Sequence, residues 1–309
     1  MLSIPTLHGK EKSYISKKEG KGQGISMVEV KIDNFVFNCR TAGMSNRGDG
    51  IILLHGFPET SHMWLELMTL LSSKGFRVVA PDQRGYSPGA RPRKVSAYKF
   101  GKLVDDIFSM ADSFGFNQFH LVGHDWGASI GWGMVAVNPD RGISWTAMSV
   151  PHLKAFGEAL KTDDDQKRKS RYFGFFKLPF IPELYFSFNN HQNLKNIWNQ
   201  STAEEIDAYL QVFEGKGALK ASLNWYRANI GSGSINENLN VLGDINTPSQ
   251  LIWGNKDMAL GRRGTELTEK FMKGPYRFIE IEAGHWLIQE AYEEVSASIL
   301  ELIEMNTNP

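Results

Sequence analysis

The stretch HLVGHDWGAS, residues 120–129, carries the pattern that decides the fold class of this chain. An apolar run typical of a buried strand ends in Gly-His-Asp-Trp-Gly, and an apolar helical pattern follows it. The spacing small-x-nucleophile-x-small is typical of a nucleophile elbow, a sharp turn that exposes one reactive side chain between a strand and a helix. Serine is the usual residue at its centre, but here the residue is Asp125.

A second stretch, GYSPG at residues 85–89, has similar spacing but fails on its chemistry. In an elbow, the backbone N–H of the residue after the nucleophile donates to the oxyanion that forms in the reaction. Pro88 follows Ser87 and has no N–H to donate. Asp125 follows a strand, and Trp126 after it keeps its N–H. We therefore predict that Asp125 is the nucleophile and that Ser87 lies in a turn-rich loop.

Strand-like and helix-like patterns alternate on both sides of the elbow. This alternation predicts an α/β fold with a mostly parallel, doubly wound sheet. Residues 27–43 read as a β-hairpin that turns at Asp33 and Asn34. Further strands are predicted within 51–56, 76–82, 118–124, 142–150, 248–257 and 276–285, and helices within 63–75, 98–115, 127–139, 262–273 and 289–304.

The pattern changes over residues 153–243, which are helical, rich in aromatic residues and broken by Pro and Gly. We predict an inserted helical lid there, and an α/β core made of residues 27–152 and 244–309. The charged run KTDDDQKRKSR within the lid is typical of a solvated helix face. Residues 1–26 are polar and rich in Lys and Gly, so we expect a flexible leader.

Composition excludes several classes of function. Of the 309 residues, 41% are apolar and 22% charged, and 34 Lys and Arg balance 34 Asp and Glu. This neutral balance predicts no nucleic-acid partner. We also expect no stable membrane insertion, since no apolar run approaches the roughly 18 residues that a membrane helix needs. Cys39 is the only cysteine, which fits a cytoplasmic location. We expect no cofactor and no metal, and a homodimer stays open.

Two residues near the end of the chain complete a catalytic arrangement. Asp257 follows the strand in LIWGNKD, and His285 follows the last strand in AGHWL. The carboxyl ends of parallel strands share one sheet edge, so both side chains should lie near Asp125, with Asp257 as the acid that orients His285, the base. We also expect the amides of Phe57, in LLHGFPE, and Trp126 to form an oxyanion hole.

Residues 27–305 resemble the α/β-hydrolase superfamily and, within it, the soluble epoxide hydrolases. The motifs that carry the resemblance are HGFP, GHDWG, WGNKD, AGHW and, in the lid, NWYRANI. The resemblance implies that lid tyrosines protonate the epoxide oxygen and maps them onto Tyr226 and, in RYFGFFKLP, onto Tyr172, with Tyr185 as a rival. It also implies an epoxide as substrate, with water as the second reactant, and the aromatic lid predicts that this epoxide is hydrophobic. We expect the substrate pocket to be lined by Trp126, Phe57, Phe176 and Trp286.

A carboxylate nucleophile explains why Asp125 stands where serine is usual. A carboxylate can attack saturated carbon without first losing a proton, and the resulting ester is then hydrolysed by water that a His–Asp pair activates. A haloalkane or haloacid dehalogenase would use the same nucleophile and is the main alternative. It needs N–H donors for the halide, and nothing in the sequence marks Trp198 or Trp225 as the second donor. A non-catalytic ligand receptor on the same fold is the remote alternative.

Overall fold

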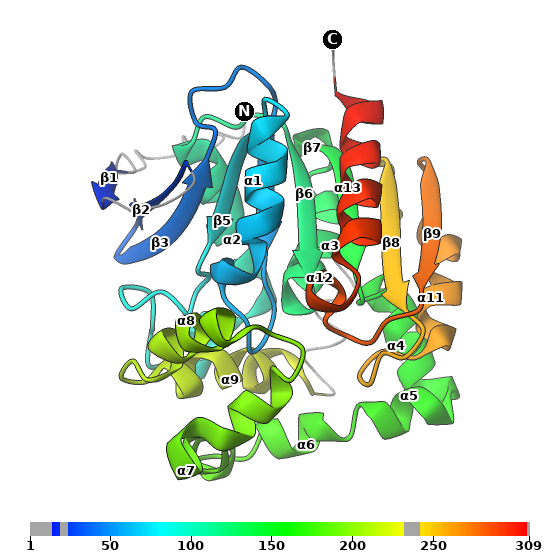
Figure 1. Cartoon of the computed structure of the whole chain (residues 1–309). Helices are drawn as coiled ribbons and strands as arrows, with labels where there is room; N and C mark the ends of the chain where they lie inside the picture. The colour runs from blue at the N-terminus through cyan, green and yellow to red at the C-terminus, as the bar shows by residue number, and fades with distance from the viewer. Residues whose placement is uncertain (1–13, 19–23, 232–241, 308–309) are drawn as a thin grey trace, which may run out of the picture.

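A computed structural model describes residues 14–18, 24–231 and 242–307 of the protein. Within these residues, the centre is a nine-stranded sheet with the order β1-β2-β3-β5-β4-β6-β7-β8-β9 (Figure 1). Strands β4 to β9 pair in parallel, whereas β1, β2 and β3 join one edge in antiparallel pairing. The strands are β1 (Tyr14–Lys18), β2 (Ile25–Ile32), β3 (Phe35–Ala42), β4 (Gly50–Leu54), β5 (Arg77–Pro81), β6 (Phe119–His124), β7 (Gly142–Met148), β8 (Ser249–Gly254) and β9 (Tyr276–Ile281).

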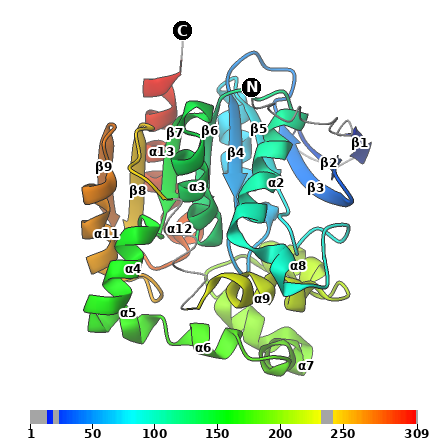
Figure 2. The ribbon, with the colours of Figure 1, turned by 180° about the vertical axis from the view of Figure 1, so that it is seen from behind.

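Helices cover both faces of this sheet. In Figures 1 and 2, α1 and α13 lie on one face and α2 and α3 on the other. Every residue of β4, β6 and β8 is buried, which explains why these strands are continuous apolar runs. The predicted α/β fold is therefore confirmed. The core helices are α1 (Leu65–Ser73), α2 (Phe100–Ser113), α3 (Trp126–Val137), α11 (Arg262–Thr268), α12 (Leu287–Glu290) and α13 (Tyr292–Asn306).

Six further helices form a layer across the carboxyl ends of the parallel strands (Figure 1). They start directly after β7, where we place the beginning of the lid; its other border adjoins residues 232–241, which lie outside the described residues. Of the described helices, none is long and apolar enough to cross a membrane. The lid helices are α4 (Leu153–Thr162), α5 (Asp164–Lys169), α6 (Tyr172–Phe176), α7 (Ile181–Ile197), α8 (Ala203–Phe213) and α9 (Ala218–Asn229).

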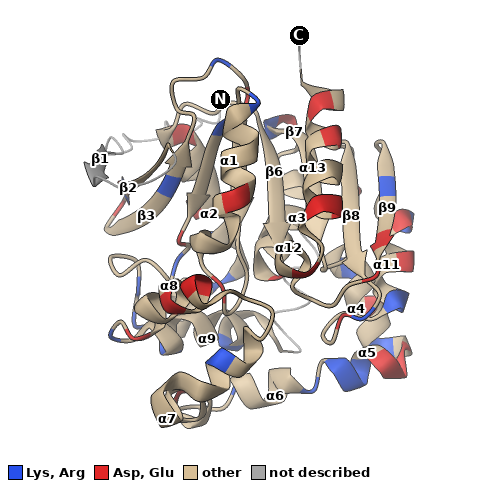
Figure 3. Ribbon diagram, in the orientation of Figure 1, with Lys and Arg blue, Asp and Glu red and all other residues tan. Residues whose placement is uncertain are grey.

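The charged run in the lid includes α5, whose acidic residues lie in its first turn and whose basic residues lie in its last turn (Figure 3). Lys167 pairs with Asp164 at 2.8 Å and Arg168 with Asp165 at 2.6 Å, and all four side chains are exposed by more than a third. This is the solvated helix face that we predicted. Such exposed pairs contribute little to stability.

The prediction of a flexible leader over residues 1–26 is wrong for part of that range. Residues Tyr14–Lys18 form β1, which pairs antiparallel with β2, and β2 itself begins at Ile25. The physical reason is the free edge of β2, whose unpaired N–H and C=O groups can bind any extended segment that reaches them, polar or not. The rest of the leader lies outside the described residues except Gly24.

Two helical glycines differ in the space around them and allow a test of the packing. A Cβ on Gly131 in α3 would collide with the indole of Trp145, which is fully buried on β7. We expect Gly131→Ala to lower the free energy of unfolding by about 1–3 kcal/mol, because overpacking costs more than the helix propensity of alanine returns. The matched control is Gly101→Ala in α2, where nothing lies within 4 Å. It should raise the same free energy by up to about 1 kcal/mol in urea unfolding; an equal response of both variants would contradict this packing.

Candidate active site

Asp125 occupies a strained turn between β6 and α3. Its backbone has φ 51° and ψ −118°, a conformation that residues with a Cβ rarely adopt. Three glycines let the chain close around it. A Cβ on Gly56 would lie 2.5 Å from Asp125 Oδ1, one on Gly123 would lie 2.5 Å from the carbonyl oxygen of Gly127, and one on Gly127 would collide with the carbonyl of Leu54. The glycines of the GHDWG motif are therefore required by backbone contact.

The three side chains predicted to act together lie in one line. His285 Nδ1 is 2.9 Å from Asp257 Oδ2, and His285 Nε2 is 3.7 Å from Asp125 Oδ2. Asp257 Oδ1 accepts hydrogen bonds from the amides of Ala259 at 2.7 Å and Leu260 at 2.9 Å. These two amides fix the Asp257 carboxylate, which in turn orients the imidazole with Nε2 toward Asp125.

Neighbouring charges decide the protonation of this line. Burial alone would lower the pKa of His285, but the charge of Asp257 and the carboxylate of Asp125 outweigh it and raise that pKa well above 6.5. Burial alone would raise the pKa of Asp125, but His285, His124 and the amide of Phe57 outweigh it and lower that pKa. In the free protein at neutral pH, the pair is therefore an imidazolium facing a carboxylate.

The predicted oxyanion hole faces the other oxygen of the same carboxylate. The amide of Phe57 donates to Asp125 Oδ1 at 2.8 Å. Trp126 is the first residue of α3, where a backbone N–H has no acceptor within its own helix. The Phe57–Pro58 peptide bond is cis.

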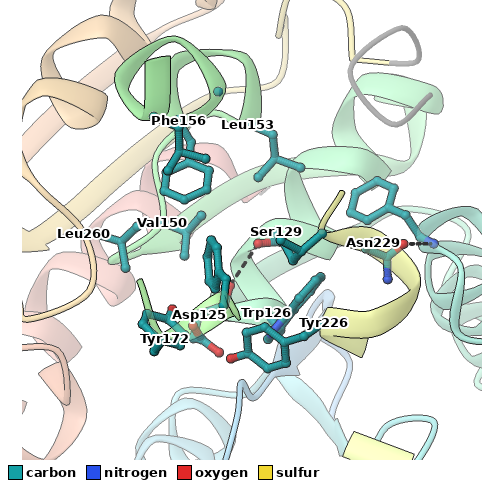
Figure 4. A pocket seen from close by; sticks show the side chains of 15 residues that line it. Asp125, Trp126, Ser129, Val150, Leu153, Phe156, Tyr172, Tyr226, Asn229 and Leu260 are labelled. Atoms are coloured by element: carbon teal, nitrogen blue, oxygen red, sulfur yellow. Dashed lines mark hydrogen bonds between the residues drawn. The ribbon is translucent and has the colours of Figure 1, made fainter. Parts of the chain in front are cut away.

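Tyr172 and Tyr226 reach Asp125 from the lid, from α6 and α9 respectively (Figure 4). Both line the cavity that contains Asp125, and their ring centroids are 6.2 Å apart. Burial and then the charge of Asp125 raise the pKa of each phenol well above 10, so both stay protonated and can donate. Tyr185 is 49% exposed, packs against Phe175, and does not line this cavity.

Helix α9 is anchored to the core next to this cavity. Asn229 Oδ1 accepts from the amide of Phe100 at 2.8 Å (Figure 4). Asn229 Nδ2 donates to the carbonyl of Tyr98 at 2.8 Å. The ring of Trp126 packs edge to face on the ring of Tyr226 with a centroid distance of 5.2 Å. Tyr226 is therefore held by its helix and by the ring of Trp126.

The cavity above Asp125 has a volume of about 90 Å³ and an almost wholly apolar lining. Of the four residues predicted to line the substrate pocket, only Trp126 does so. Phe57 and Phe176 instead pack edge to face at 5.3 Å and fill the space behind Tyr226, and Trp286 packs on His285 and faces a different cavity. The wall that sequence reasoning missed comes from α4, from α6 and from the segments that follow β7, α9 and β8, and includes Val150, Leu153, Phe156, Phe173, Ile230 and Leu260.

Sequence reasoning also missed a polar network beneath His285. His124, inside the GHDWG motif, contacts the carbonyl of His285 through Nε2 at 2.9 Å and Glu59 Oε2 through Nδ1 at 3.1 Å. Both partners are acceptors, so a doubly protonated ring satisfies both. Gln289 donates to the other oxygen of Glu59 at 2.9 Å. Their positions in the sequence, Glu59 directly after HGFP and His124 directly before Asp125, could have drawn attention to them. Neither residue lines the cavity of Asp125.

The rejected motif proves to be structural. Ser87 is fully buried, donates to the carbonyl of Asp82 and accepts from the amide of Asn38 at 2.9 Å. His55 braces the loop after β4, since its Nε2 accepts from the amide of Gln83 at 3.2 Å. Neither side chain lines the cavity of Asp125.

Comparisons with known proteins agree with this geometry. A family model described as alpha/beta hydrolase fold matches residues 50–292. The AB hydrolase superfamily protein YfhM of Bacillus subtilis is 31% identical over 287 residues, which cover 91% of this chain and 99% of that protein. Human epoxide hydrolase 4 is 32% identical over 293 residues, covering 91% of this chain and 79% of that protein. Among solved structures, a variant of an epoxide hydrolase from Bacillus megaterium matches with a TM-score of 0.81 at 26% identity, covering 89% of this chain and 99% of that one.

The two carboxylates beside His285 predict how its imidazole titrates. We expect the imidazole of His285 to titrate above pH 6.5 in the free protein, and Asp125→Asn to move that midpoint downward, because one of the two anions that hold the proton is lost. The measurement is an NMR titration of the His285 ring, assigned with His285→Gln. Asp164→Asn, on the exposed α5, is the control and should leave the midpoint unchanged. A midpoint that stays or rises in Asp125→Asn would contradict the assigned charges.

Proposed function

The chain belongs to the α/β-hydrolase family and, within it, to the epoxide hydrolases, and from this premise we propose that it converts a hydrophobic epoxide to a vicinal diol through an ester of Asp125. One observation supports this proposal most strongly. A buried carboxylate shares an apolar cavity with two protonated phenols, Tyr172 and Tyr226. An epoxide needs both partners at once, a nucleophile for carbon and a proton donor for oxygen.

In the first step, Asp125 Oδ2 attacks a ring carbon of the epoxide. The C–O bond of the ring breaks, and the ring oxygen takes a proton from Tyr172 or Tyr226. Oδ1 is already held by the amide of Phe57, which leaves Oδ2 to attack. The products of this step are the hydroxyalkyl ester of Asp125 and one tyrosinate.

Ester formation also switches His285 from acid to base. The ester carries no charge, so His285 loses one of the two anions that raise its pKa, and its proton becomes available to restore the tyrosinate. The neutral imidazole, oriented by Asp257, can then take a proton from water.

In the second step, that water attacks the ester carbonyl. The negative charge that develops on Oδ1 is stabilised by the amides of Phe57 and Trp126. The C–O bond between the Asp125 carbonyl carbon and the alkoxy group breaks, and the alkoxide takes the second proton of the attacking water from the new carboxyl group and leaves as the diol. Asp125 is again a carboxylate and His285 again an imidazolium, so the sum is epoxide plus water giving diol.

The dehalogenase alternative lacks its second halide donor among the described residues. The indole N–H of Trp225 donates to the carbonyl of Arg84 at 2.8 Å, and Trp198 does not line the cavity. A receptor without activity would have no use for a nucleophile, base and acid that all meet around one cavity.

The proposal predicts a pattern across one panel of epoxides and haloalkanes, with diol and free halide measured together. We expect the wild type to release diol and no halide. Asp125→Asn should lose turnover, and Tyr172→Phe with Tyr226→Phe should lower kcat/KM by about 100-fold or more, because general acid catalysis typically contributes about 10²–10⁴-fold. Halide release that survives the loss of both tyrosines would support the dehalogenase instead.

Tyr185→Phe is the matched control among the lid tyrosines. Its ring lies on the surface of α7 and does not line the cavity of Asp125, so we expect diol formation within about twofold of the wild type. A loss as large as that of Tyr172→Phe would transfer the role of the first lid acid to Tyr185.

A further inference from the structure

A second cavity lies against His285, separate from the apolar cavity that contains Asp125. Its volume is about 480 Å³, compared with about 90 Å³ for the apolar one. Asp125 lines only the apolar cavity, whereas His285 and Trp286 line only the larger one. The nucleophile and the base are therefore reached from two different spaces.

The lining of the larger cavity is far more polar than that of the apolar cavity. It comes from α7 and the turn after it, together with the loops that follow β8 and β9. Several amide side chains contribute to it, as do a lysine and a glutamate. The polar residues that matter here are Asn193, Asn196, Asn199, Gln200, Lys256 and Glu290. This is a lining that holds water and not the alkyl part of an epoxide.

The wall between this cavity and the base is held firmly. Glu290 Oε2 accepts from the amide of Gly284 at 2.7 Å, and its Oε1 accepts from the amide of Trp286 at 3.2 Å. The ring of Trp286 packs against that of His285 with a centroid distance of 4.8 Å. The loop that presents His285 therefore keeps its place beside the polar cavity.

The second step of the proposed reaction needs a water molecule that the apolar cavity does not readily supply. The alkyl group of the Asp125 ester would occupy this cavity, and its apolar lining offers a water few hydrogen-bond partners. The polar cavity stays open to water at that stage, because no part of the ester is bound in it. It also adjoins His285, the residue that must activate the water.

We infer that the polar cavity beside α7 delivers the hydrolytic water to His285, while the epoxide reaches Asp125 through the apolar cavity. This inference rests on the proposed function, because it concerns the hydrolysis of the ester. It makes the amide side chains of α7 and the following turn that line the polar cavity determinants of the second step alone. The first step should not depend on them.

The test fills the polar cavity with a large apolar side chain and follows each step. Asn196→Trp and Gln200→Trp both change exposed lining residues, so neither disturbs the core. Gln192→Trp is the matched control, since Gln192 is equally exposed on α7 but does not line the cavity. Each protein is mixed with styrene oxide, quenched at short times, and analysed by mass spectrometry for the ester of Asp125. Steady-state kcat and kcat/KM for diol formation are measured alongside.

We expect the ester of the two lining variants to decay about tenfold more slowly than that of the wild type. Their kcat should be lowered and their kcat/KM unchanged, because kcat/KM reports only the steps up to ester formation. Gln192→Trp should match the wild type. Unchanged ester decay in both lining variants would overturn the inference. A fall in kcat/KM with normal ester decay would also overturn it, because the epoxide would then enter through the polar cavity. A wild type that makes diol without any ester of Asp125 would refute the proposed function, and the inference with it.

Discussion

The tight turn at Asp125 is the constraint on which the rest of this structure depends. A positive φ at a residue with a Cβ is unfavourable, and it persists only where the surroundings enforce it. Here Gly56, Gly123 and Gly127 allow three backbone segments to approach so closely that any side chain would collide. The same closeness places the amide of Phe57 on Asp125 Oδ1 and begins α3 at the next residue.

The charges around this turn stabilise each other in a buried space. An isolated ion would be costly there, but each of the three has partners that suit its charge. Asp257 accepts from two backbone amides, His285 lies between two carboxylates, and Asp125 accepts from Phe57. The arrangement is also poised to change, since conversion of Asp125 to an ester removes one of the anions that keep His285 protonated.

The lid divides the space above the sheet by packing aromatic rings. Phe57 lies in edge-to-face contact with Phe176, Phe186, Phe213 and Tyr226, so the loop after β4 is the surface on which the lid aromatic cluster rests. This packing closes the centre and leaves an apolar cavity on the side of Asp125. A polar cavity remains on the side of His285. Two reactants of opposite polarity, an epoxide and water, would each have a matching space.

The sequence by itself determined the features that depend on which residues are neighbours along the chain. Glycine spacing and the missing N–H of Pro88 separated the elbow at Asp125 from the decoy at Ser87, and strand ends placed Asp257 and His285 at one sheet edge. Only the tertiary structure decided which aromatic residues line the cavity, because Phe57, Phe176 and Trp286 are apolar and close to the site yet turn toward other neighbours. It also decided that residues Tyr14–Lys18 form a strand, because their partner is the free edge of β2. The conformation of a backbone turn depends on neighbouring residues, whereas the direction of a side chain in a packed interior depends on residues that are distant in the chain.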